Sequence, residues 1–123
     1  MPLTILHAED HEIVAQAVKV TLESEGWRVV TCADGAAALS ELASPARYDL
    51  LITDNDLPRL TGLDLIGCVQ MLRHRSALPV LMLTATDCER EARRIGVAAY
   101  LRKPEGLQEL VPTVRLLLLG RGA

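Results

Sequence analysis

Short apolar runs alternate with amphipathic stretches along the whole chain, and this alternation limits the folds that the chain can adopt. Two of the runs, 50–52 and 80–83, are continuously apolar, which is typical of strands buried on both faces. In the stretches between the runs, apolar residues recur every three or four positions, which predicts helices. Because strands and helices alternate with short connections, the sequence predicts an α/β fold with a parallel sheet between two layers of helices.

The pattern predicts five strands and five helices in strict alternation. The strands are expected at 3–8, 28–32, 48–53, 80–84 and 98–101. The helices are expected at 11–25, 36–42, 63–73, 86–95 and 107–119. We expect the fourth helix to begin at a capping box formed by Thr86 and Glu89. A proline inside the last helix would cost about 3 kcal/mol, so we expect its regular part to begin at Pro112.

The amino-acid composition of the chain excludes some classes of function. A chain of 123 residues, half of them hydrophobic, suits a single folded domain over 1–123 rather than a disordered segment. Its 13 basic and 16 acidic residues give a net charge of −3, and aromatic residues make up only 2% of the chain. These values argue against direct nucleic-acid contact.

The N-terminal sequence, the length of the apolar runs and the cysteines indicate the cellular compartment. The chain lacks a signal-like N-terminus and any apolar run long enough to span a membrane, so we expect no membrane association. Its cysteines, Cys32, Cys68 and Cys88, are odd in number and lack the spacing of a zinc site. Reduced thiols of this kind indicate a cytoplasmic protein, with Cys88 a small buried residue rather than a redox centre.

Polar residues follow the strands at the points where the strands end. In a sheet of this class, ligands bind at the carboxyl ends of the strands. The residues that meet at this edge are Glu9 and Asp10 after the first strand, Asp54 and Asp56 after the third, Thr84 after the fourth and Lys103 after the fifth. Two carboxylates about 5 Å apart repel each other by about 3 kcal/mol, so such a cluster requires a cation. Oxygen ligands favour Mg²⁺, an ion that also binds phosphate oxygens.

This arrangement indicates a site that handles a phosphoryl group. Asp54 is the carboxylate best placed to act as a nucleophile. We expect Lys103 to bind a phosphoryl oxygen and Thr84 to form a hydrogen bond beside it. Phosphoryl transfer depends mainly on positioning and on neutralisation of charge, so no general base is required.

These residues, in this order and spacing, resemble the receiver domain of two-component response regulators. The resemblance covers nearly the whole chain and depends on several motifs in register. They are Glu9-Asp10, 50–58 with Gly62, Thr84-Ala85 and 100–104. The resemblance implies a flavodoxin-like, doubly wound sheet of five parallel strands in the order 2-1-3-4-5. It also implies a signalling module that catalyses only its own phosphoryl transfer and autodephosphorylation.

By this resemblance, Asp54 is the phospho-acceptor. The donor would be the phosphohistidine of a sensor histidine kinase or of a histidine phosphotransfer protein in a phosphorelay. Glu9, Asp10 and Asp54 would hold Mg²⁺ together with the backbone carbonyl of Asp56.

The resemblance also assigns roles around the phosphoryl group. Thr84 and Lys103 would contact it, and Tyr100 would be the aromatic residue whose rotamer reports the state. Pro104 would follow a cis peptide bond that directs the lysine. The downstream effector remains unassigned by the sequence.

Three features depart from the family pattern. The stretch from Thr84 to Lys103 is shorter by about three residues, close to one helical turn, and the deficit falls in the fourth helix. Pro112 interrupts the last helix, and Asp56 adds a carboxylate beside the acceptor. The first two changes put the usual output geometry in question, whereas we expect Asp56 to alter the lifetime of the phosphoryl group.

Alternative functions remain open at this point. A degenerate receiver that acts only in protein–protein interaction would keep the fold without the phosphorylation. A Mg²⁺ enzyme is the other class, since Asp54 and Asp56 are similar to acidic pairs of toprim and haloacid-dehalogenase enzymes. Toprim does not require Thr84 or Lys103, and the dehalogenase motif belongs on the first strand.

Two further expectations concern other residues. His7 and His11 flank the first acidic pair, but they lie at a strand-to-helix junction and are not expected to bind metal. The run 116–119 is apolar throughout, so one or two of its leucines must point away from the core. Such exposure suggests a homodimer contact or plain surface.

Overall fold

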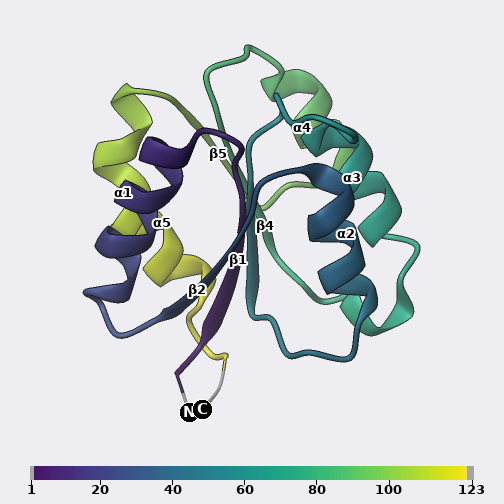
Figure 1. Ribbon diagram of the computed structural model, residues 1–123, viewed down its shortest axis with the longest axis horizontal. Helices are drawn as coiled ribbons and strands as arrows, with labels where there is room; N and C mark the ends of the chain where they lie inside the picture. The colour runs from purple at the N-terminus through teal and green to yellow at the C-terminus, as the bar shows by residue number, and fades with distance from the viewer. Residues whose placement is uncertain (1, 122–123) are drawn as a thin grey trace.

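Five parallel strands form one sheet at the centre of the computed structural model, which describes residues 2–121 (Figure 1). The strands are β1 (Thr4–Ala8), β2 (Arg28–Cys32), β3 (Leu50–Thr53), β4 (Val80–Thr84) and β5 (Ala99–Arg102). Their order in the sheet is β2-β1-β3-β4-β5, and all four neighbouring pairs are parallel. The predicted α/β fold and the order 2-1-3-4-5 are confirmed.

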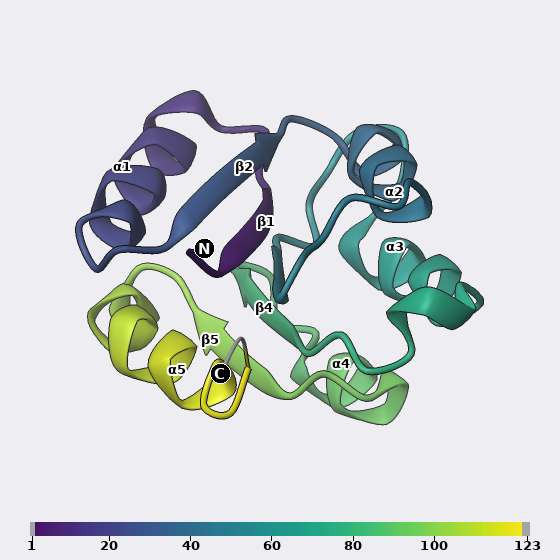
Figure 2. The same cartoon turned by 90° about the horizontal axis from the view of Figure 1, so that it is seen from below.

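Five α-helices cover the two faces of the sheet. They are α1 (Glu12–Glu23), α2 (Gly35–Ala43), α3 (Gly62–Val69), α4 (Glu89–Ile95) and α5 (Leu110–Leu117). Two short 3₁₀ helices, η1 (Arg73–Arg75) and η2 (Glu105–Glu109), precede β4 and α5. Helices α1 and α5 lie on one side of the sheet, and α2, α3 and α4 lie on the other (Figure 2).

The strands divide their side chains between two hydrophobic layers. On β1, Ile5 packs toward α1 and α5, whereas Leu6 packs toward α2, α3 and α4. On β3, Leu50 and Ile52 join the first layer and Leu51 joins the second. Because successive side chains of a strand point to opposite faces, the continuous apolar runs are what a sheet buried on both faces needs.

The turn after β3 depends on one glycine. Gly62 begins α3 directly against the end of β3, and a Cβ atom at this position would lie 2.2 Å from the backbone oxygen of Asp54. The Thr61 side chain caps the helix by accepting a hydrogen bond from the backbone N–H of Asp64. The close approach of α3 therefore fixes the backbone around Asp54.

The beginning of the fourth helix differs from the prediction. Helix α4 begins at Glu89 after Cys88, and no side chain caps its N-terminus. The Thr86 hydroxyl donates instead to the Asp56 carboxylate, and the predicted capping box is wrong because the side chain has this other partner. The helix has seven residues and ends at Ile95, followed by Gly96 as a left-handed cap with φ +101°, which agrees with the predicted shortening.

The last helix also differs from the prediction. Helix α5 begins at Leu110, so Pro112 is its third residue and not its first. The first four N–H groups of a helix have no partner within the helix, so a proline in the first turn costs no hydrogen bond. Near the C-terminus, Leu116 and Leu119 are exposed and Leu118 is buried, as the apolar run required. Within residues 2–121, none of the helices is long and apolar enough to cross a bilayer.

Candidate functional site

Three carboxylates meet at the carboxyl end of the sheet. Glu9 and Asp10 follow β1, and Asp54 follows β3, which is the neighbour of β1. Each of the three offers one oxygen, and these oxygens all lie within 4.8 Å of one another. Glu9 and Asp54 are buried, whereas Asp10 is exposed to solvent. The parallel register of β1 and β3 thus brings together acids that are 44 or more residues apart in the chain.

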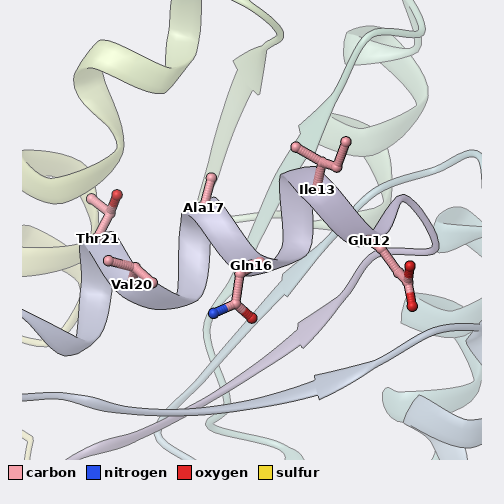
Figure 3. A pocket seen from close by; sticks show the side chains of 6 residues that line it. All are labelled: Glu12, Ile13, Gln16, Ala17, Val20 and Thr21. Carbon is pink, nitrogen blue, oxygen red and sulfur yellow. The ribbon is translucent and has the colours of Figure 1, made fainter.

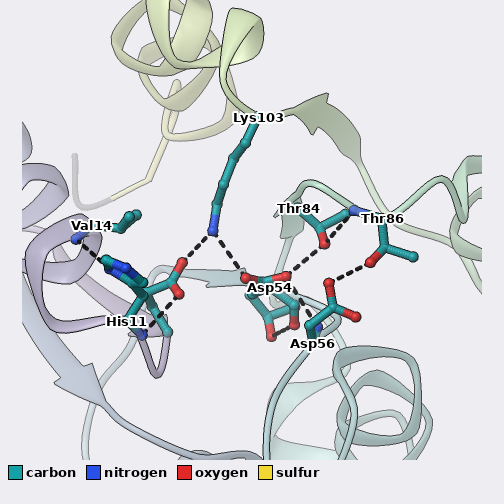
Figure 4. A network of polar contacts seen from close by, with 9 residues as sticks. His11, Val14, Asp54, Asp56, Thr84, Thr86 and Lys103 are labelled. Carbon is teal, nitrogen blue, oxygen red and sulfur yellow. Dashed lines mark hydrogen bonds and ion pairs between the residues drawn. The ribbon is translucent and has the colours of Figure 1, made fainter.

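Lys103 lies between two of these carboxylates (Figure 4). Its Nζ atom is 2.5 Å from Glu9 Oε1 and 2.9 Å from Asp54 Oδ2. The residue follows β5, and its peptide bond to Pro104 is cis. Three carboxylates and one ammonium still leave two negative charges at the site.

The other oxygen of Asp54 accepts two hydrogen bonds. The Thr84 hydroxyl donates to Asp54 Oδ1 over 2.6 Å, and the backbone N–H of Asp56 donates to the same atom over 3.1 Å. Thr84 is fully buried at the end of β4. The Asp54 carboxylate is therefore held at both oxygens by donors from three different segments of the chain.

These contacts determine the charge state of the site. Burial alone would raise the pKa of Asp54, but the hydrogen bonds from Thr84 and Lys103 outweigh it and hold the pKa below its ordinary value. Burial likewise disfavours a charged Lys103, but its bonds to Glu9 and Asp54 raise the pKa of the ammonium. Asp54 is thus an ionised carboxylate at neutral pH, and Lys103 is protonated.

The donor set fits a hard divalent cation. Its ligand atoms are carboxylate oxygens, two of the residues are buried, and Asp10 opens the site to water. Mg²⁺ prefers such oxygen ligands and keeps some of its own water molecules. The two surplus negative charges match the charge of the ion.

The carboxylate of Asp56 takes a different direction from the other acids. Its side chain is exposed and accepts a hydrogen bond from the Thr86 hydroxyl (Figure 4). Among the residues that the structure describes, the acid cluster contains Glu9, Asp10 and Asp54 but not Asp56. The predicted convergence of four carboxylates is therefore reduced to three, because Asp56 is bound elsewhere.

Tyr100 is connected to the Asp56–Thr86 hydrogen bond through the backbone of Thr86. Its hydroxyl donates to the backbone oxygen of Thr86 over 2.5 Å and accepts from the backbone N–H of Cys88 over 3.0 Å. Both Tyr100 and Cys88 are buried. Sequence reasoning selected Tyr100 but missed Thr86, which it assigned to a helix cap. The position of Thr86 two residues after Thr84 is the signal that could have placed it in the loop beside the site.

His7 is a second residue whose setting was missed. It is fully buried near the carboxyl end of β1, and neither ring nitrogen has a hydrogen-bond partner within residues 2–121. Burial, with a smaller contribution from the nearby Lys103 charge, lowers its pKa from 6.5 to about 4. The ring is thus neutral at physiological pH. The ring is not part of the cluster formed by Glu9, Asp10 and Asp54.

Comparison with known proteins places this chain in a family. The family model of the response regulator receiver domain matches residues 5–115. Response regulator protein PmrA of Pseudomonas aeruginosa is 40% identical over 121 residues, which cover 94% of this chain and 52% of that protein. The chain thus spans about half the length of the curated relatives that it matches.

Solved structures show the same fold. Chemotaxis response regulator CheY4 of Vibrio cholerae has a TM-score of 0.87 at 31% identity, with 96% of this chain and 100% of that chain covered. Response regulator protein TrrA of Thermotoga maritima, solved in complex with Mg²⁺-BeF, has a TM-score of 0.82 at 27% identity. That match covers 94% of this chain and 99% of the other. The chain belongs to the receiver domain family of two-component response regulators.

Proposed function

We propose that Asp54 of this receiver domain accepts a phosphoryl group and that the domain passes on the resulting change of state. The observation that carries the proposal is the setting of the Asp54 carboxylate. It is ionised, is held by Thr84 and Lys103, and lies within 4.8 Å of the carboxylate oxygens of Glu9 and Asp10. Donors on both sides of one ionised carboxylate suit a nucleophile whose product carries added negative charge.

The transfer step follows from these contacts. An oxygen of Asp54 attacks the phosphorus of a phosphohistidine, and an O–P bond forms as the P–N bond breaks. The electron pair of the P–N bond stays on the imidazole nitrogen of the donor. Lys103 and Thr84, which already donate to Asp54, are within reach of oxygens that the new group places beside it. Neither residue needs to gain or lose a proton in this step.

Mg²⁺ is the cofactor that we propose. Glu9, Asp10 and Asp54 would hold it, together with the backbone carbonyl of Asp56. When bound, the ion supplies positive charge that offsets the phosphoryl oxygens. The surplus of two negative charges supports this choice.

The proposed donor is a sensor histidine kinase or a histidine phosphotransfer protein. A protein donor needs contact area beside the site, and α1 begins two residues after Asp10. The outer face of α1 carries exposed apolar side chains, among them Ile13, Ala17 and Val20 (Figure 3). This face gives such a donor an apolar surface on the helix that follows Asp10.

We assign residues 1–123 to one receiver domain that acts in signalling, with no turnover activity beyond its own phosphorylation and autodephosphorylation. The downstream effector is left open, because the relatives are about twice as long as this chain. A homodimer through the exposed Leu116 and Leu119 stays a prediction.

Incubation with acetyl phosphate and Mg²⁺ tests the proposal. The wild type should incorporate acid-labile phosphate, and Asp54→Asn should incorporate none. Asp64→Asn is the matched control, since Asp64 lies on α3 outside the acid cluster. Incorporation by Asp54→Asn at the wild-type level would refute the assignment. Absence of incorporation in the wild type would favour a domain that acts only by protein interaction.

A further inference from the structure

We infer that Asp56 is a positioning residue that holds Tyr100 in its buried state before any phosphoryl group arrives. It does so through Thr86. The carboxylate of Asp56 binds the Thr86 hydroxyl, and the Thr86 carbonyl binds the Tyr100 hydroxyl. The inference extends the proposed function, because it gives the resting position of the residue expected to report the phosphorylation state.

The Asp56–Thr86 hydrogen bond connects two loops that have no strand or helix in common. Asp56 lies between β3 and α3, and Thr86 lies between β4 and α4. Its two partners are 30 residues apart in the chain. Asp56 is fixed at its other end, since its backbone N–H donates to Asp54 Oδ1. The loop after β4 is thus tied to the same segment that presents the acceptor carboxylate.

Three further hydrogen bonds, all of the Thr86 backbone, connect the Asp56 contact to the rest of the loop and to Tyr100. Its backbone N–H donates to Thr84 Oγ1 over 3.2 Å, and its backbone oxygen accepts from Tyr100 over 2.5 Å. Its backbone oxygen also accepts from the N–H of Cys88 over 3.1 Å. One residue therefore connects the buried threonine beside Asp54 with the buried tyrosine. Movement of Thr86 away from Asp56 would displace the backbone oxygen that accepts the hydrogen bond from the Tyr100 hydroxyl.

The bond also explains why an extra acid is tolerated beside Asp54. A carboxylate directed at Glu9 and Asp10 would add repulsion to a cluster that already has surplus negative charge. The Asp56 carboxylate is directed at Thr86 instead, where a hydroxyl donor stabilises it. The Asp56 carboxylate therefore makes a structural contact within the loops and does not act as a fourth carboxylate ligand, which leaves its backbone carbonyl free for the proposed metal site.

The helix that follows offers little independent support for this loop. Helix α4 has only seven residues, and no side chain caps its N-terminus. The loop between β4 and α4 is therefore ordered mainly by contacts from outside, namely those of Asp56 and Tyr100. A single hydrogen bond matters more in a loop with this little support.

The two tyrosines of the chain allow a direct test. Protein carrying tyrosine labelled with ¹³C in the ring gives signals from Tyr48 and Tyr100, and relaxation by a soluble gadolinium chelate reports their exposure. Tyr48→Phe assigns the signals. In the wild type without phosphodonor, both rings should be protected, in accord with their burial. Thr86→Val removes the hydroxyl donor at nearly constant volume, and Thr86→Ser keeps the donor.

We expect Thr86→Val to raise the exposed population of Tyr100 roughly tenfold, which is the effect of losing a hydrogen bond to a charged acceptor. Asp56→Ala should have the same effect, and the double variant should be no worse than either single variant. Thr86→Ser should keep the wild-type protection. Tyr48 should stay protected throughout, which shows that each variant is folded.

Two results would overturn the inference. One is unchanged protection of Tyr100 in both Thr86→Val and Asp56→Ala. The other is loss of protection in Thr86→Ser equal to that in Thr86→Val, which would assign the effect to packing. Mg²⁺ with beryllofluoride, a mimic of the phosphoryl group, should restore protection in Thr86→Val. Lack of any response to beryllofluoride in all variants would count against the Asp54 proposal, whereas the comparison of the free proteins would still decide the role of Asp56.

Discussion

The ammonium of Lys103 lies 2.9 Å from the carboxylate of Asp54, although the two residues are 49 positions apart in the chain. Each group stabilises the charge of the other, because the contact raises the pKa of Lys103 and helps to lower that of Asp54. The same ammonium also contacts Glu9, so it competes with any cation for two of the three clustered acids.

Replacement of this lysine should separate metal binding from phosphorylation. In Lys103→Met, we expect Mg²⁺ affinity to be retained or to rise, since a competing charge is gone. Phosphate incorporation should fall by about tenfold to a hundredfold, the effect of a lost charge-assisted hydrogen bond in the transition state. Metal titration by NMR and incorporation from acetyl phosphate measure the two effects. Arg90→Met, on the exposed side of α4, is the control, and an equal loss of both properties in Lys103→Met would contradict this account.

His7 should make the fold less stable in acid. Its pKa is lowered from 6.5 in the unfolded chain to about 4 in the folded one. As the pH falls between these values, the unfolded chain takes up a proton that the folded chain does not, so the free energy of unfolding decreases. By the lower value the loss is about 3 kcal/mol, whereas above the unfolded pKa this histidine contributes no pH dependence.

The variant His7→Val tests this expectation by denaturant unfolding at several pH values. It should be more stable than the wild type at neutral pH by about 1–3 kcal/mol, because two buried ring nitrogens without partners are removed. Its advantage should increase further as the pH falls. Parallel pH profiles for His7→Val and the wild type would show that the buried ring does not titrate as described.

Gly62→Ala should disturb both the fold and the acceptor. The added Cβ would lie 2.2 Å from the Asp54 backbone oxygen and 2.9 Å from the Cα of Asn55, so the backbone must move. Overpacking of this kind costs about 1–3 kcal/mol in the free energy of unfolding. Gly67→Ala is a matched control on the same helix, because its nearest contact would be an ordinary 3.7 Å. Equal stability of the two variants would mean that α3 does not approach Asp54 as closely as described.

The exposed face of α1 should affect transfer from a protein donor but not from a small one. Ile13→Glu should slow phosphorylation by a histidine phosphotransfer protein about tenfold or more, since buried apolar contacts at the centre of an interface carry much of its energy. Its rate with acetyl phosphate should equal that of the wild type. Met71→Glu, equally exposed but outside α1, is the control. Slowing with both donors would place the effect in the site itself.

Much of this architecture could be predicted because it depends on local pattern. The run 80–84 is apolar up to its last residue, and β4 has these same bounds. The polar residues at or just after the ends of β1, β3, β4 and β5 had to meet, because the carboxyl ends of parallel strands lie at one edge. Glu9, Asp54, Thr84 and Lys103 are therefore neighbours for a reason that is visible in the sequence.

The remainder depends on partners that the sequence does not show. Thr86 fits a capping box by its spacing, but the hydroxyl has a better acceptor in Asp56, which comes from a different loop. The start of α5 was misplaced by two residues, because a proline is equally acceptable at the first and third positions of a helix. His7 gave no sign of its lack of hydrogen-bond partners, which only the packing of α1 and α5 over β1 produces.

The central claim is that Asp54 itself receives the phosphoryl group. The most direct measurement is reduction of the phosphorylated protein with borohydride, which converts an acyl phosphate to an alcohol, followed by mass spectrometry of two tryptic peptides. Residues 1–19 contain Asp10, and residues 48–59 contain Asp54 and Asp56. We predict one reduced side chain, at Asp54, and none in protein that was not phosphorylated. Reduction at Asp10 or Asp56, with Asp54 unchanged, would contradict the account.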